Sequence, residues 1–241
     1  MKKVEISKKK FIRNIVITII ALVIVAYILN MVPGYARDKF EGKIQLVIGA
    51  ENYTEELTYD IYINDEEVVY LSKEDIANFF DATIYYDKKE ARIITSSNEK
   101  VASMVLKKKE ININGYIVPI DNPMIEKEGV IYVPIVELAV VYNIQVNYIK
   151  DTNILVIDEL NKQKMTAGIS RDTNLKNWPR GLSRTVGELK KGERVEYFNE
   201  PKNGWVKVRM GNGQLGYVKE DGIVNTYVIR QDMPIDEIER E

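Results

Sequence analysis

The chain has 241 residues, enough for one or two modest domains, and its 34 basic and 36 acidic side chains leave a net charge of −2. It contains no histidine and no cysteine. These absences exclude a Ser-His-Asp triad, a cysteine nucleophile and a disulfide, and they argue against zinc and copper sites, which normally need imidazole or thiolate. We therefore expect no metal and no other cofactor.

The charges divide the chain into blocks. The net charges are +5 for residues 1–14, zero for 15–36, −9 for 37–162, +5 for 163–228 and −3 for 229–241. Blocks of such different charge predict separate parts: a cytoplasmic basic segment, an apolar segment, an acidic domain, a basic domain and an acidic linker or tail.

The apolar segment predicts a membrane anchor. Residues 15–32 form a run of 18 in which Thr18 and Asn30 are the only clearly polar side chains. As a helix this run would be about 27 Å long, close to the thickness of the hydrocarbon core of a bilayer. The basic residues before it should stay in the cytoplasm. The sequence therefore predicts a single-pass protein of the cell membrane with its carboxy-terminal domains outside.

A cleaved signal peptide is the alternative for the same segment. Gly34, Tyr35 and Ala36 place small residues at the offsets that signal peptidase needs for cleavage before Arg37. The apolar run is longer than the usual signal core of 7–15 residues, which favours an uncleaved anchor followed by a linker over 33–42. Cleavage near Ala36 stays open at this point.

An internal repeat follows the linker. Residues 69–95 align with residues 131–157 at an offset of 62 without a gap, and apolar and tyrosine positions match along the whole length. Each copy predicts a strand, a short helix and two further strands, with Ser72 as the helix N-cap in the first copy. Between the copies, Asn114-Gly115 within alternating sequence predicts a hairpin. Two such units would share one core.

Several motifs in this block resemble the copper amine oxidase N-terminal-like domain. They are Asn114-Gly115, residues 123–129, Tyr132-Val133-Pro134, residues 146–148 and residues 155–157. The resemblance covers residues 43–158 and implies an α+β stalk-like domain of the kind found in exported proteins of Gram-positive bacteria. It implies no copper site, since no histidine exists to bind the metal. The implied role is a spacer, with a ligand-binding groove lined by Tyr85, Tyr86 and Tyr148 as the alternative.

The basic block predicts a small all-β barrel. Short alternating stretches between glycine turns occupy residues 163–228. The motifs Gly187–Gly192, Asn203–Arg209 and Asn212–Val218 resemble the bacterial SH3-like domain, whose hallmarks are a Leu-Lys-Lys-Gly turn, an Asn-Gly-Trp-x-Lys-Val strand and a closing Gly-Tyr-Val. The resemblance implies binding of cell-wall peptidoglycan or of a partner peptide.

One strand of this block carries the candidate binding face. Alternation places Val206, Val208 and Met210 toward the core and the intervening side chains toward solvent. An indole beside two cations suits an anionic polymer of sugar and peptide, although the indole could instead close the barrel. The candidate ligand-binding residues are Trp205, Lys207, Arg209, Asn203, Tyr217 and Trp178.

These patterns predict a membrane-anchored, non-catalytic protein that binds cell wall (peptidoglycan or an anionic wall polymer), with no nucleic acid as partner. The order of domains also resembles the N-terminal region of family 18 glycoside hydrolases. The Asp-x-x-Asp-x-Asp-x-Glu motif of that family is absent from the chain, so no enzyme is predicted within it. The alternatives are the anchoring and targeting part of such a glycoside hydrolase and a receptor for an extracellular peptide.

Overall fold

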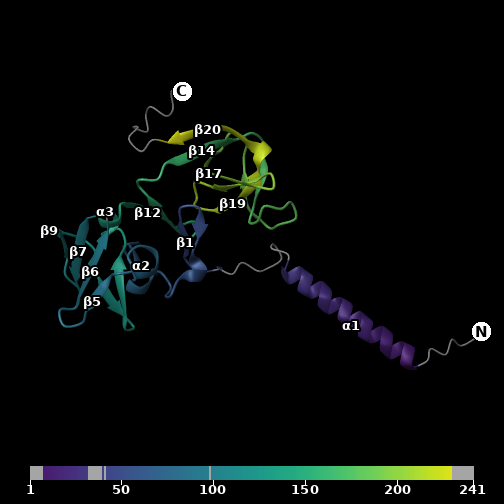
Figure 1. The fold of residues 1–241 in the computed structure, drawn as a ribbon, viewed down its shortest axis with the longest axis horizontal. Coiled ribbons are helices and arrows are strands. Elements are labelled where there is room, and N and C mark those ends of the chain that lie inside the picture. The colour runs from purple at the N-terminus through teal and green to yellow at the C-terminus, as the bar shows by residue number, and fades with distance from the viewer. Residues whose placement is uncertain (1–7, 32–39, 41, 98, 230–241) are drawn as a thin grey trace, which may run out of the picture.

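The structure is a computed structural model that describes residues 8–31, 40, 42–97 and 99–229. Helix α1 (Lys8–Met31) lies apart from two folded domains (Figure 1). Its side chains from Asn14 to Val25 are exposed. No helix in the described part of the chain reaches the length and apolarity that crossing a membrane requires. Most of the linker over 33–42, the cleavage position near Ala36 and the tail beyond residue 229 fall outside the described residues.

The first domain, called here the repeat domain, holds residues 42–159 and contains three small sheets. One sheet has the order β12-β13-β1-β2, one β10-β11-β4-β3 and one β5-β6-β7-β8-β9. In chain order, its elements are β1 (Gln45–Ile48), β2 (Glu51–Asn52), the 3-10 helix η1 (Thr54–Glu56), β3 (Tyr62–Ile63), β4 (Val69–Ser72), α2 (Lys73–Phe79), β5 (Tyr85–Asp87), β6 (Arg92–Ser97), β7 (Lys100–Val105), β8 (Glu110–Ile113), β9 (Tyr116–Pro119), β10 (Ile125–Lys127), β11 (Val130–Pro134), α3 (Ala139–Tyr142), β12 (Ile144–Ile149) and β13 (Ile154–Glu159).

The structure confirms the internal repeat at the level of strand register. Tyr86 pairs with Ile93 in the first copy, and Tyr148 pairs with Leu155, 62 residues on, in the second. The leading strands of the two copies, β4 and β11, are antiparallel neighbours, and Leu71 pairs with its own repeat equivalent, Val133. The antiparallel pairing of these equivalent residues places a local twofold axis at this strand pair. Both side chains are fully buried, so the copies share one core, as predicted.

Local sequence signals explain how the copies begin and how they are joined. Ser72 caps α2 and accepts a hydrogen bond from the backbone N–H of Asp75 at 3.0 Å. Asn114 and Gly115 both have positive φ (51° and 88°) and join β8 to β9 in the predicted two-residue hairpin. Asn143 ends α3 in the left-handed conformation, which asparagine tolerates better than most residues.

The second domain, called here the barrel domain, is the predicted all-β barrel and contains seven strands in the order β16-β15-β19-β18-β17-β14-β20. Val206 and Val208 are fully buried in its core, as the alternation predicts, and Met210 packs against them. Its elements are β14 (Lys164–Ile169), β15 (Thr173–Lys176), β16 (Thr185–Leu189), β17 (Arg194–Lys202), β18 (Trp205–Arg209), β19 (Leu215–Lys219), the 3-10 helix η2 (Glu220–Gly222) and β20 (Ile223–Ile229).

Candidate functional site

The predicted binding face is the outer face of β17, β18 and β19. Strand register divides it into three rows that run across the strands, each with one residue from each strand. In the order β17, β18, β19, the first row is Glu196, Arg209 and Leu215, the second is Phe198, Lys207 and Tyr217, and the third is Lys202, Trp205 and Lys219. The rows differ in what covers them.

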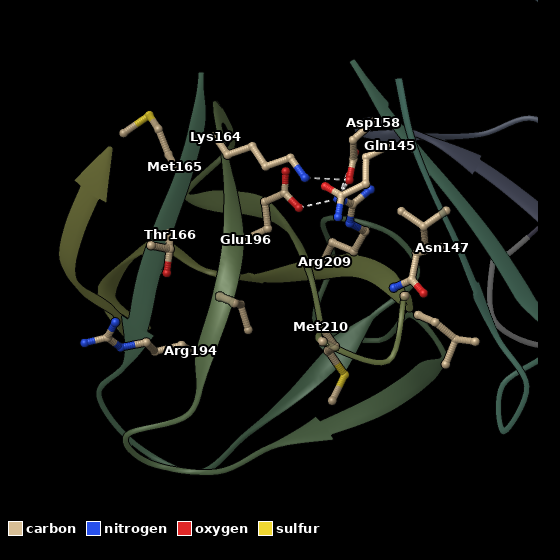
Figure 2. Close-up of a pocket in the computed structure, with 15 residues that line it drawn as sticks. Gln145, Asn147, Asp158, Lys164, Met165, Thr166, Arg194, Glu196, Arg209 and Met210 are labelled. Carbon is tan, nitrogen blue, oxygen red and sulfur yellow. Dashed lines mark hydrogen bonds and ion pairs between the residues drawn. The ribbon is translucent and has the colours of Figure 1, made fainter. Parts of the chain in front are cut away.

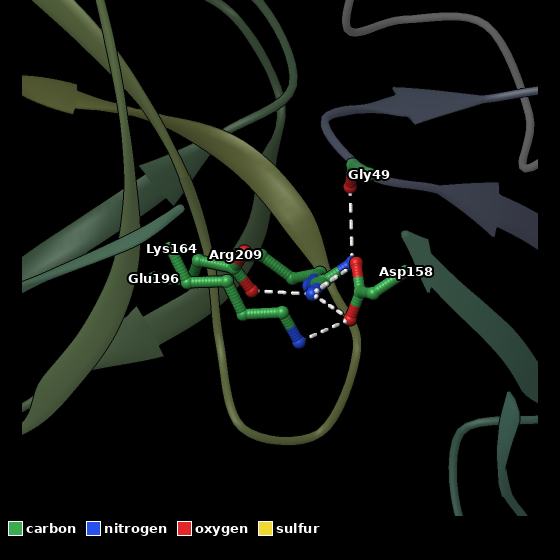
Figure 3. Close-up of polar contacts among 5 residues, drawn as sticks. All are labelled: Gly49, Asp158, Lys164, Glu196 and Arg209. Carbon is green, nitrogen blue, oxygen red and sulfur yellow. Dashed lines mark hydrogen bonds and ion pairs between the residues drawn. The ribbon is translucent and has the colours of Figure 1, made fainter. Parts of the chain in front are cut away.

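The first row is docked on the repeat domain, so the prediction that Arg209 faces solvent is wrong. Arg209 is only 5 % exposed. One Nη atom donates to both carboxylate oxygens of Asp158 (2.9 and 2.7 Å) and to Glu196, and the other donates to the carbonyl of Gly49 (2.9 Å). Lys164 adds a contact to Asp158 at 2.8 Å (Figure 3). A guanidinium engaged by partners from both domains is an interdomain lock and leaves no donor face for a wall polymer.

Burial and charge act in opposite directions on the two carboxylates of this lock. Burial by itself would raise the pKa of Asp158, but hydrogen bonds from Arg209 and Lys164 outweigh it and hold that pKa below its usual value. Burial raises the pKa of Glu196, and the nearby charge of Asp158 adds to that rise against the attraction of Arg209. The lock therefore favours the ionised form of Asp158, whereas burial disfavours the ionised form of Glu196.

An apolar contact accompanies the lock. Val47, Ile154 and Val156 of the repeat domain form a small buried cluster against which Leu215 of the barrel domain packs. Gly213 approaches the same surface so closely that a Cβ atom there would lie 3.0 to 3.2 Å from side chains of the repeat domain. The hydroxyl of Thr152 also donates to the carbonyl of Asn212 at 2.7 Å. The domains thus meet through a packed interface as well as through charge.

A cleft remains where the two domains meet (Figure 2). It has a volume of about 340 Å³ and is lined by Gln145 and Asn147 from β12 and by Thr166 and Met210 from the barrel domain, among others. Arg209, Asp158, Lys164 and Glu196 also line it, and these are the members of the lock. Most of its charged groups are consequently engaged with one another, which makes the cleft a poor site for an ionic ligand.

The second row lies at the margin of the interface. Lys207 forms an ion pair with Glu51 of the repeat domain at 2.6 Å, and its side chain is only 12 % exposed. The prediction that Lys207 is a free cation on a solvent face is therefore wrong as well. Its ammonium lies 5.9 Å from the centroid of the Tyr217 ring. Tyr217 stays half-buried and pairs with Lys176 of β15 on its other side.

The third row lies outside the interface. Trp205 is half-buried and does not belong to the barrel core, so the indole does not close the barrel from inside. It lies between Lys202 and Lys219, both of which are exposed and form no ion pair among the described residues. Asn203 begins the exposed turn that joins β17 to β18, with a φ of 54°. This row combines the predicted indole with two cations, Lys202 and Lys219, that the sequence analysis did not single out, whereas the predicted cations Lys207 and Arg209 lie in the other two rows.

Trp178 lies in the loop between β15 and β16, at the end of a strand that borders the same face. Its side chain is 49 % exposed, and Leu182 in the same loop is 91 % exposed. The loop is closed by Ser183, whose hydroxyl donates to the carbonyls of Trp178 (2.9 Å) and Arg180 (2.8 Å). This loop therefore presents two large apolar side chains, but it leaves β15 at Lys176, the partner of Tyr217 in the second row, and not next to the third row.

Comparison with protein-family models identifies both domains. Residues 50–157 match the model described as copper amine oxidase N-terminal domain, and residues 174–224 match the model described as bacterial SH3 domain. The chain therefore carries a copper amine oxidase N-terminal domain followed by a bacterial SH3 domain. Neither the search of curated proteins nor that of solved structures returned a match. The barrel domain is called the SH3 domain from here on.

The partners that engage the SH3 domain were not predicted as functional residues. Glu51 and Gly49 belong to the β1–β2 hairpin, and Asp158 ends the second copy of the repeat. The opposite net charges of the two domains were a signal for contact between them, because complementary charge favours association. Local sequence patterns do not report which residue of one domain contacts which residue of the other, so the individual interdomain pairs could not be predicted.

The tyrosine groove suggested as an alternative is present only in part. Tyr85 and Tyr86 line one groove of the repeat domain. Tyr148 does not line it and instead packs against the core and donates to Asn153 at 2.8 Å. The three tyrosines therefore do not form a single site.

Proposed function

We propose that this protein binds anionic cell-wall polymer through the third row of its SH3 domain and that the repeat domain holds this row away from a membrane. The observation that carries the proposal is the pair of exposed lysines, Lys202 and Lys219, on either side of the indole of Trp205. Bacterial SH3 domains commonly bind cell-wall polymer, and the match over residues 174–224 supports the same role here.

The chemistry of the row fits an anionic polymer that contains sugars. Exposed ammonium groups attract carboxylates or phosphates as point charges, and the indole supplies an apolar platform with one hydrogen-bond donor. Lys207 and Arg209 already neutralise carboxylates of the repeat domain, so a ligand would have to displace these contacts to reach them. The free cations of the third row require no such displacement.

The repeat domain serves this function as a rigid spacer. The lock around Arg209 and the apolar cluster around Leu215 fix the first row against β13, which leaves the third row on the far side of the face. A ligand on that row would therefore be held at a set position relative to the repeat domain. A flexible tether would leave this position undefined.

Anchoring in the cell membrane is part of the same proposal. Its support is the uncharged run over residues 15–32, the six basic residues before it and the exposed side chains of α1 between Asn14 and Val25. With this topology the amino terminus is cytoplasmic and both domains lie outside, where wall polymer is found. The same arrangement would serve the targeting region of a family 18 glycoside hydrolase, which is the second function the domain order suggests.

The test is a double charge reversal in the third row, Lys202→Glu with Lys219→Glu. Binding of the full-length protein to isolated, protein-free cell wall should fall at least tenfold, while its melting temperature should stay nearly unchanged, because exposed charges shift stability by no more than about 0.5 kcal/mol each. Binding by the unaltered protein should also weaken as salt rises from about 0.1 M to about 1 M, since screening shortens the reach of exposed charges.

The membrane anchor has its own test: on cell fractionation, the protein should be recovered from the membrane fraction.

The matched control is Lys190→Glu with Lys191→Glu, which makes the same change in charge on an exposed turn away from the outer face. This control should retain most of the binding. An equal loss in both double variants would show that only the overall charge of the domain matters and would overturn the assignment to the third row. Full binding by the Lys202/Lys219 variant would overturn it too.

A further inference from the structure

The repeat domain carries a groove that the wall-binding row does not explain. It lies beside β5 of the first copy of the repeat, is also lined by the start of the second copy at Ile131, and has a volume of about 720 Å³. Its floor includes the buried Ile84 and Ile131. Three tyrosines and four charged side chains make up most of the rest of its lining.

Tyr59 and Tyr85 give this groove an exposed aromatic wall, while Tyr86 also lines it but packs against the core of the repeat domain. The side chains of Tyr85 and Tyr59 are 60 % and 40 % exposed, and Tyr86 is half-buried. Packing does not require an aromatic side chain at residue 85, because the second copy of the repeat has Asn147 at the equivalent position of the same hairpin register. Exposed phenol rings with free edges and a hydroxyl are suited to sugar rings, which offer an apolar face and many hydroxyls.

The charges that line the groove are balanced. Lys73 and Lys88 supply two positive charges, and Glu74 and Glu126 supply two negative ones. Lys73 and Glu74 also form an ion pair at 3.1 Å. A groove without net charge gives no preference to an anionic polymer, in contrast to the lysine-flanked indole of the SH3 domain. Its charged groups can instead donate to and accept from hydroxyl and amide groups of a neutral ligand.

Two strand edges border the same groove. β5 and β10 are each the outermost strand of their sheets, so one side of each strand is not paired within the described part of the chain. Backbone N–H and C=O groups at such an edge are available to a ligand with polar groups. A groove of several hundred Å³ with an aromatic wall and a few polar groups is typical of a ligand-binding site.

We propose that this groove binds a neutral glycan chain. The proposal rests on the wall-binding function for the source of the ligand, because the wall offers glycan strands next to anionic polymer. The two domains then take two different components of one material: the SH3 domain takes the anionic polymer, and the repeat domain takes the uncharged sugar chain. The link between the domains makes the second contact intramolecular once the first has formed, so two individually weak contacts give a stronger combined attachment.

The test uses the tetramer of N-acetylglucosamine as the probe and the full-length protein in detergent, with binding measured by isothermal titration calorimetry. Tyr85→Ala should weaken binding about tenfold, the loss expected when a ring contact worth about 1.4 kcal/mol is removed. The matched control is Tyr116→Ala on β9, a tyrosine that is 77 % exposed and lies outside the groove. This control should bind like the unaltered protein, and salt should leave all affinities unchanged.

The two proposals can fail separately. The Lys202→Glu with Lys219→Glu variant should bind the tetramer with unchanged affinity even where it no longer binds isolated wall. The glycan proposal is overturned if the unaltered protein shows no saturable binding of the tetramer, or if Tyr116→Ala weakens binding as much as Tyr85→Ala does. It is also overturned if the double lysine variant loses the tetramer, because the sugar would then be bound by the SH3 domain.

Discussion

The two copies of the repeat share one strand register but differ in what covers their outer face. In β6 of the first copy, Ile93 and Thr95 are buried, while the alternating positions Arg92, Ile94 and Ser96 are at least partly exposed. In β13 of the second copy the equivalent outer positions, Ile154, Val156 and Asp158, are only 1 %, 6 % and 8 % exposed. The SH3 domain accounts for this difference, since it packs on that face.

The comparison shows that the repeat conserves its inner face and varies its outer face. The inner positions of both copies fill one core around the Leu71–Val133 pair. The outer face of the second copy provides a docking surface, and the outer edge of the first copy carries Tyr85 and its groove. The loss of stability on substitution should therefore decrease from the shared core, through the interdomain lock, to the rim of the interface between the domains.

The largest effect is expected at Leu138, which is fully buried in the shared core. Leu138→Asp would place an uncompensated charge there, at a cost of several kcal/mol in the free energy of unfolding. Both copies should unfold together, with a single loss of structure followed by circular dichroism on heating. Val140→Asp is the control, because Val140 is 56 % exposed on α3, which begins one residue after Leu138, and this substitution should change the melting temperature little. Separate melting of the two copies would contradict the shared core.

Much of the fold could be predicted from the sequence, because its signals are local or periodic. The offset of 62 residues, the Asn114-Gly115 hairpin and the N-cap at Ser72 all appear in the structure as expected. The same holds for Val206 and Val208 in the core of the SH3 domain. These features depend only on residues that are close in sequence or that alternate within one strand, so the amino-acid sequence predicts them directly.

A smaller effect is expected in the lock between the domains. Arg209→Ala removes the cation that Asp158 and Glu196 share and leaves buried carboxylates with reduced compensation, which typically costs about 3–5 kcal/mol. The two domains should then melt in two transitions in differential scanning calorimetry, whereas the unaltered protein should melt in one. Arg194→Ala is the matched control, because Arg194 is an exposed arginine on β17. A single unchanged transition in Arg209→Ala would show that the lock does not couple the domains.

The candidate site could be predicted only in part, and the reason is physical. Alternation along β18 correctly separates the outward side chains from the core, but it does not report whether water or another domain covers them. Trp205 stays partly exposed in a row flanked by lysines, whereas Arg209, four residues further along the same strand, is covered by Asp158 of the repeat domain. Basic side chains that could bind an anionic ligand can equally well bind an acidic domain of the same chain. Only the tertiary structure distinguishes these two outcomes.

The smallest effect is expected where the SH3 domain touches the repeat domain with a glycine. Gly213 and Gly204 both have positive φ (83° and 74°), so alanine at either position pays the left-handed backbone cost of about 1–2 kcal/mol. At Gly204 nothing lies within 4 Å of the added Cβ, whereas at Gly213 the Cβ would meet Ile149, Ile154 and Val156 at 3.0 to 3.2 Å. Both variants lose free energy of unfolding, which can be measured from guanidinium unfolding midpoints. The difference between the loss in Gly213→Ala and the loss in Gly204→Ala therefore gives the cost of crowding this contact. We expect Gly213→Ala to be the more destabilising by about 1 kcal/mol, in the usual range for an overpacked contact. Equal losses would mean that the two domains separate readily at this loop and that the packed contact adds little to the lock.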